Sequence, residues 1–185
     1  MTAGGVFSGR RVDAGTKLLI ESLQVGEADR VLDLGCGYGP VGIVAAHLAP
    51  RGHVVLVDIN ERAVRLAREN LVLNAVQNAE VRQGDGAEAV KELTFDTIAC
   101  NPPIRAGWAV VERLLGEAGA LLVPGGCIYV VARTKQGAKT LARKLEALVG
   151  PTEEVERGGG YRGYRAQRRT AGTPPSSMSP TTKEP

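Results

Sequence analysis

The chain reads Val31-Leu32-Asp33-Leu34-Gly35-Cys36-Gly37-Tyr38-Gly39-Pro40 at the point that decides its fold. Residues 31–34 have the apolar character of a short buried strand, and the alternating glycines predict a tight turn after it. Pro40 suits the first position of a helix, because its backbone angle is helical and its missing N–H has no partner there. Ligands of open parallel sheets bind where such strands end. The stretch therefore predicts a strand, a ligand-binding loop and a crossover helix.

The same alternation of strand and helix continues along the chain. Further strands are predicted at 54–57, near 81–83, at 95–100 and at 127–132, and helices at 13–23, 41–48, 60–74, 109–122 and 136–148. Pro124-Gly125-Gly126 is predicted as a turn that precedes the strand at 127–132. The segments 152–157 and 161–168, joined by glycines, predict a terminal antiparallel hairpin. These elements predict an α/β, Rossmann-like sheet of seven mostly parallel strands with helices on both faces.

Composition predicts one folded domain over residues 6–169, because 43% of the 185 residues are hydrophobic. Residues 1–5 are expected to be loose, and the Pro/Ser/Thr-rich residues 170–185 to form a disordered tail. The 3 cysteines and 2 histidines show no disulfide or zinc-site spacing, and no apolar run is long enough to cross a membrane. We therefore expect a reduced, cytoplasmic protein without metal or membrane. The oligomeric state stays open.

The net charge of +3 hides an asymmetry along the chain. Residues 1–132 carry a net charge of −3, whereas residues 133–169 carry +6. Such a basic segment has two alternative interpretations: a face that is simply solvated, or a surface that attracts nucleic-acid phosphates.

Two cofactors fit the glycine loop. Gly37, Gly39 and Gly42 match the dinucleotide fingerprint, with Asp58 21 residues after Gly37. S-adenosylmethionine fits as well: it has no pyrophosphate, and its ammonium and sulfonium groups favour a carboxylate such as Asp33 beside the loop. In either case an acidic residue at the end of the second strand would accept hydrogen bonds from ribose hydroxyls. Asp85, after the third strand, could accept from an adenine amino group or could simply form a turn.

Asn101-Pro102-Pro103 follows the strand at 95–100, at the same sheet edge as the glycine loop. The prolines remove two N–H donors, so the segment offers mainly acceptors: backbone carbonyls and the Asn101 carboxamide. The nitrogen of an amide or base amine carries two hydrogens, and two acceptors could bind both of them. The lone pair of that nitrogen would then point toward an electrophilic methyl group. Catalysis would then come from orientation and electrostatic preorganisation rather than from a strong base.

The segments VLDLGCGYGP, VVLVDIN and NPPI, in this order, resemble class I S-adenosylmethionine-dependent methyltransferases of the small-domain (MTS) group. The opening GVFSGRRVDAGTKLLIESL resembles the segment before the first strand of bacterial ribosomal RNA guanine-N2 methyltransferases, and NPPIRAG resembles a single-domain branch of that group. The resemblance covers about residues 5–169.

The resemblance implies roles for residues across the chain. It implies catalytic roles for Asn101, Pro102 and Pro103, and cofactor contacts from Thr16, Asp33, Gly35, Gly37, Asp58, Ile59, Asp85, Gly86 and Asn101. It also implies that Phe7, Val12, Gly15 and Thr16 close over the methionine end and the target. The position of Ile104 is often aromatic in this superfamily, so Phe7 or Trp108 could supply the ring that stacks on a base. Phe7, Ile104, Arg105 and Trp108 are the predicted substrate contacts.

The main hypothesis is an S-adenosylmethionine-dependent N-methyltransferase that acts on a guanine exocyclic amine (N2) in ribosomal RNA. An alternative keeps the donor and changes the acceptor to a protein glutamine amide or a small molecule. A closed acceptor pocket would favour this alternative, and a basic rim would favour RNA. An NAD-binding oxidoreductase and a non-catalytic RNA-binding relative are the more remote hypotheses.

Overall fold

The computed structural model of the chain describes residues 12–170. Its seven strands form one sheet in the order β3-β2-β1-β4-β5-β7-β6. They are β1 (Arg30–Leu34), β2 (His53–Asp58), β3 (Ala79–Gln83), β4 (Phe95–Cys100), β5 (Leu122–Arg133), β6 (Thr152–Gly158) and β7 (Tyr161–Gln167). Strands β1 to β5 pair in parallel, and β7 lies antiparallel between β5 and β6. The predicted fold class and terminal hairpin are therefore confirmed.

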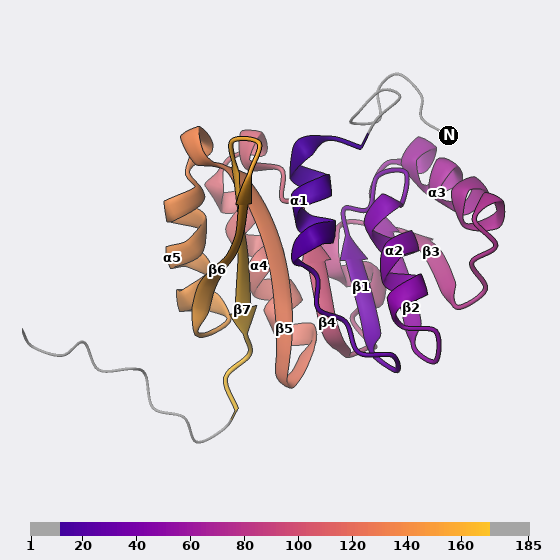
Figure 1. Cartoon of the computed structure of the whole chain (residues 1–185). Helices are drawn as coiled ribbons and strands as arrows, with labels where there is room; N and C mark the ends of the chain where they lie inside the picture. The colour runs from indigo at the N-terminus through magenta and orange to yellow at the C-terminus, as the bar shows by residue number, and fades with distance from the viewer. Residues whose placement is uncertain (1–11, 171–185) are drawn as a thin grey trace, which may run out of the picture.

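Five α-helices cover the two faces of the sheet (Figure 1). They are α1 (Ala14–Ser22), α2 (Pro40–Leu48), α3 (Glu61–Leu73), α4 (Trp108–Leu121) and α5 (Ala138–Leu148), with short 3-10 turns η1 (Gly86–Val90), η2 (Ile104–Ala106) and η3 (Thr134–Gln136). Helices α1, α2 and α3 lie on one face, and α4 and α5 lie on the other. Asp13 and Asn60 cap α1 and α3 by accepting backbone N–H groups, which fixes where these helices begin.

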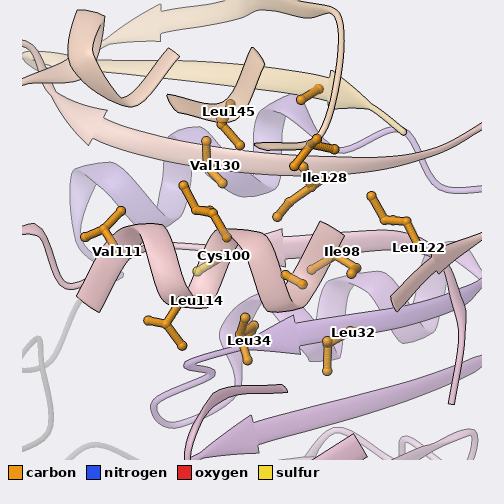
Figure 2. Packing of buried hydrophobic residues seen from close by; sticks show 14 of the residues in the cluster. Leu32, Leu34, Ile98, Cys100, Val111, Leu114, Leu122, Ile128, Val130 and Leu145 are labelled. Atoms are coloured by element: carbon orange, nitrogen blue, oxygen red, sulfur yellow. The ribbon is translucent and has the colours of Figure 1, made fainter. Parts of the chain in front are cut away.

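The largest part of the core lies between the sheet and α4 and α5 (Figure 2). Ile98 of β4 and Ile128 of β5 are fully buried there, against Leu115 of α4 and Leu145 of α5. Central strands covered on both faces read as continuous apolar runs, and this is why their positions were predictable from the sequence. The three cysteines, Cys36, Cys100 and Cys127, are also buried and unpaired.

The predicted start of the fifth strand is wrong. Strand β5 begins at Leu122, which pairs with Phe95, and the next paired residue, Cys127, lies opposite Thr97. Residues 123–126 therefore bulge out of the strand opposite a single residue, Asp96. Pro124-Gly125-Gly126 does interrupt the pairing, as glycine and proline predict, but it does so inside the strand rather than before it.

Other sequence predictions fall on residues that the structure does not describe. The loose residues 1–5, the contact from Phe7 and all but the first residue of the predicted tail 170–185 lie outside residues 12–170. Within the described range, no helix has the length and apolar content needed to cross a membrane.

Two glycine-to-alanine substitutions are expected to change stability in opposite directions. A Cβ atom at Gly52 would lie 2.0 Å from the backbone oxygen of Asp29, so Gly52→Ala should lower the free energy of unfolding by about 2 kcal/mol or more. At Gly116, within α4, a Cβ atom meets nothing within 4 Å, so Gly116→Ala should raise it by about 0.5–1 kcal/mol. Urea denaturation of both variants measures these changes, and a stabilised Gly52→Ala variant would contradict the packing described here.

Candidate functional site

A cavity of about 1000 Å³ opens at the sheet edge where the parallel strands end. Its walls come from the glycine loop after β1, the ends of β2 and β5, the loops after β3 and β4, and the start of α1. Thirteen predicted site residues line this one cavity: Thr16, Asp33, Gly35, Gly37, Asp58, Ile59, Asp85, Gly86, Asn101, Pro102, Pro103, Ile104 and Arg105. The structure therefore brings the predicted cofactor loop and the predicted acceptor loop together.

The glycine loop leaves room for a ligand. Gly35 and Gly37 have backbone φ angles of +75° and +58°, in the left-handed region that side chains other than glycine rarely adopt. A Cβ atom at either position would meet nothing within 4 Å, so the space above the loop belongs to the cavity. The glycines thus serve both the turn and a close approach of a ligand to the backbone.

The carboxylate of Asp58 ties this loop to the end of β2. Its Oδ2 accepts the Gly37 N–H at 2.8 Å, and its Oδ1 accepts the Asn60 N–H at 2.8 Å. Each carboxylate oxygen can accept a further hydrogen bond. Asp58 is therefore held in a fixed orientation at the cavity wall, with acceptor capacity left for hydroxyl groups of a ligand.

Asp33 lies beneath the loop and is only 3% exposed. Burial raises the pKa of this carboxyl to about 7, the Gly42 N–H that it accepts at 2.8 Å opposes the rise, and the nearby Asp58 charge adds to it. This arrangement also occupies the N-terminus of α2. Pro40 has no N–H, and the Gly42 N–H is directed at Asp33, so this helix end is a poor anchor for a pyrophosphate.

Asp85 has a partner that the sequence analysis missed. Arg113 of α4 donates to both of its carboxylate oxygens, at 2.9 and 3.1 Å, and also to Glu117. Arg113 itself lines the cavity. The two residues are 28 positions apart, so only the packing of α4 beside η1 reveals the pair.

The predicted acceptor loop lies directly beside the glycine loop. Leu34 at the end of β1 pairs with Cys100 at the end of β4, so the next residues, Gly35 and Asn101, start neighbouring loops. The loop after Asn101 is fixed by its own backbone: the Ile104 N–H donates to the Pro102 oxygen at 2.9 Å. Asn101 is exposed at the cavity wall, and the Pro102 oxygen keeps a second lone pair.

Two tyrosines, Tyr38 in the glycine loop and Tyr161, are the aromatic residues that line the cavity within residues 12–170. Trp108 is absent from the described residues that line the cavity, and its ring packs against Gly137 and beneath Lys144. Tyr161 at the start of β7 does line it, and its hydroxyl accepts the Nε–H of Arg133 at 2.8 Å. The sequence pattern showed Tyr161 only as part of a half-buried strand. The antiparallel register that pairs it with Arg133 places it at this edge.

Comparison with known proteins gives the family. Residues 1–165 match the family model described as "Methyltransferase small domain". The chain is 38% identical over 166 residues to the "Uncharacterized protein YbxB" of Bacillus subtilis, covering 89% of this chain and 83% of that protein. It is 36% identical over 156 residues to "Ribosomal RNA large subunit methyltransferase G" of Streptomyces avermitilis, covering 82% of this chain and 40% of the relative.

A solved structure gives the same result. The 16S rRNA N2 G1207 methyltransferase (RsmC) of T. thermophilus, solved in complex with AdoMet and guanosine, superposes with a TM-score of 0.78 at 31% identity. The match covers 89% of this chain and 46% of that one, so the chain spans about half the length of the ribosomal RNA methyltransferases that it matches. The chain belongs to the methyltransferase small domain family, which confirms the family and the enzyme class that the sequence predicted.

Proposed function

We propose that this domain transfers a methyl group from S-adenosylmethionine to the exocyclic N2 amine of a guanine in ribosomal RNA. The observation that carries the proposal is the pairing of Leu34 with Cys100, after which the loops of Gly35 and Asn101 begin on neighbouring strands. It sets a loop suited to the donor next to a loop suited to an amine, at the edge of one cavity.

The residues at the cavity fit S-adenosylmethionine better than a dinucleotide. Asp33 and Asp58 are carboxylates beside the glycine loop, which favours a ligand carrying an ammonium and a sulfonium group. In this assignment Asp33 faces the ammonium, Asp58 holds the ribose hydroxyls, and Asp85 and Ile59 contact the adenine. The Gly42 N–H, which a pyrophosphate would need at the N-terminus of α2, is already bonded to Asp33.

Bound S-adenosylmethionine supplies an electrophilic methyl group on a sulfonium. The oxygen of the Asn101 carboxamide and the second lone pair of the Pro102 oxygen would accept the two hydrogens of the target amine. They would thereby orient its lone pair toward the methyl carbon, whose bond to sulfur would break as the bond to nitrogen forms, leaving a neutral thioether. The nitrogen, positively charged once it carries the methyl group, would then lose a proton to water. Pro103 and the hydrogen bond from the Ile104 N–H keep the loop in place, so little reorganisation is needed during transfer.

Two observations favour RNA over a protein amide or a small molecule as the acceptor. Arg105 and Arg133 line the cavity, so its rim carries positive charge where phosphates would approach. Relatives over most of this chain are named ribosomal RNA methyltransferases, and one of them was solved with guanosine. Such a substrate would place the reaction in the cytoplasm.

The decisive test is transfer of tritiated methyl from S-adenosylmethionine to ribosomal RNA isolated from cells that lack this protein. Digestion to nucleosides should recover the label as N2-methylguanosine at one position of one subunit. Label in another nucleoside would overturn the guanine assignment. Transfer only to a protein or a small molecule would replace the RNA proposal by its alternative.

Cofactor binding can be tested without a substrate. S-adenosylmethionine at 100 times its Kd should raise the stability by about 2.7 kcal/mol and so raise the melting temperature, whereas NAD at the same concentration should leave it unchanged. Differential scanning fluorimetry measures both shifts. The assignment fails if NAD alone stabilises the protein.

A further inference from the structure

We propose that RNA approaches the cavity along one side of the molecule, over Arg133, Lys135, Lys139 and Arg143, which we call the basic track. The terminal hairpin, which together with the two residues after it carries five arginines, does not form this path. The inference deepens the proposed function, because it names the surface that would hold an RNA substrate at that site.

The arginines of the hairpin and the residues after it already have partners. Arg157 and Arg162 form ion pairs with Glu154, and Arg165 forms one with Glu153. The remaining two act on the backbone: Arg168 donates to the oxygens of Ala120 and Leu122, and Arg169 to that of Glu146. Two carboxylates, one of them shared, therefore pair with three of these arginines, and the other two side chains donate to backbone oxygens near the end of the sheet.

The basic track differs in both charge and exposure. Residues 133–144 contain no Asp or Glu, and the four track residues are exposed. None of the four forms an ion pair with any acidic residue in the part of the chain from 12 to 170. The fifth basic residue of this stretch, Lys144, pairs with Glu112 and is left out of the track. The positive charge of residues 133–169 that is not paired with a carboxylate and is exposed to a partner is thus concentrated on the basic track.

The basic track leads to the cavity. It begins at Arg133, which lines the cavity together with Gln136, and it continues onto α5. Lys139 and Arg143 are four positions apart on α5 and so lie on one side of that helix, about 6 Å apart along its axis. Figure 1 shows α5 at one end of the molecule, across the sheet from α3. An RNA strand that follows the track therefore reaches the cavity that the predicted acceptor loop also lines.

RNA fits this surface better than an acidic protein does. At the cavity end of the track, the guanidinium carbon of Arg133 lies 5.0 Å from the centroid of the Tyr161 ring. The guanidinium lies over the ring, which helps to hold its plane in place, and single-stranded nucleic acids stack their bases on such guanidinium planes as well as bringing phosphates to them. An acidic peptide would use the charges but has no base to stack on the guanidinium of Arg133.

The test compares two triple variants that remove the same charge. Lys135→Ala/Lys139→Ala/Arg143→Ala removes the track beyond the cavity wall. The control, Arg51→Ala/Arg65→Ala/Lys91→Ala, removes exposed charges elsewhere on the surface. The probe is a fluorescein-labelled oligouridylate of about 20 nucleotides, which contains no guanine and therefore reports binding alone. Anisotropy gives its Kd over a series of salt concentrations, and a polyglutamate of equal length gives the comparison with an acidic chain.

The track variant is expected to bind the oligouridylate at least 10-fold more weakly, with a salt slope smaller by about 2, because each lost phosphate contact removes about 0.7. Its thermal stabilisation by S-adenosylmethionine should be unchanged, and the control should bind within about 2-fold of the original protein. Equal losses in both variants, no RNA binding by the original protein, or equally tight binding of polyglutamate would each overturn the inference. Track-dependent RNA binding without methylation of ribosomal RNA would refute the proposed function and leave the track standing.

Discussion

Replacing Asn101 with alanine is expected to lower kcat for methyl transfer by about 10²–10³-fold while leaving the Kd for S-adenosylmethionine within about 3-fold. The variant loses one of the two acceptors that would orient the amine, whereas Asp58 and the glycine loop, to which we assign most of the donor contacts, keep their geometry. Single-turnover transfer to ribosomal RNA gives the rate, and isothermal titration with the donor gives the affinity.

A matched control separates this effect from the general loss of a carboxamide. Gln77 is exposed in the segment before β3, which begins at the opposite edge of the sheet, so Gln77→Ala should leave both quantities unchanged. Unchanged turnover in Asn101→Ala would remove the role assigned to Asn101. A large loss of donor affinity in that variant would instead make it a cofactor contact only.

Asp33→Asn is expected to stabilise the ligand-free protein above neutral pH and to weaken donor binding. The pKa of Asp33 is raised in the folded state from 3.8 to about 7, so between these values the folded protein binds more protons than the unfolded chain. The stability of the ligand-free protein therefore falls as the pH rises from about 4 to 7, and above pH 7 the full cost of burying an ionised carboxylate is present. An uncharged amide avoids this cost, so the free energy of unfolding of Asp33→Asn should be higher by a few kcal/mol at pH 8 and little changed at pH 4.

Urea denaturation at pH 4, 6 and 8 measures this difference, and titration with S-adenosylmethionine supplies the second readout. Donor affinity of the original protein should rise as the pH passes through about 7, because the ammonium favours the ionised carboxylate. Asp33→Asn should lack this rise. A variant that is less stable than the original protein at pH 8 would show that the negative charge of Asp33 supports the fold without a ligand.

Much of the fold and of the cavity wall could be predicted because their signals are local. Strand β4 was predicted with its observed bounds, Phe95–Cys100, since a fully buried strand is a continuous apolar run. The glycine loop and the Asn-Pro-Pro segment carry their own backbone constraints, and parallel pairing brings the ends of their strands to one edge. Because β1 and β4 are neighbours in the sheet, the glycine loop and the Asn-Pro-Pro segment that follow them lie side by side.

The features that the sequence did not yield depend on contacts between distant segments. The pair of Asp85 with Arg113 joins a loop to a helix, and the place of Tyr161 depends on the register of β7 against β5. Trp108, one of the two rings predicted to stack on a base, packs at Gly137, where the absence of a Cβ makes room for it. Charge counting likewise could not tell the paired arginines of the hairpin from the exposed track on α5.

The burial of all three cysteines makes the protein easy to label at a chosen place. Only a thiolate reacts readily with alkylating dyes, and burial raises the pKa of Cys36, Cys100 and Cys127, with Cys100 at about 12. A maleimide fluorophore should therefore leave the natural thiols untouched. A single Ala106→Cys substitution, at an exposed position on the cavity rim, would carry a dye whose emission follows occupation of the cavity in real time.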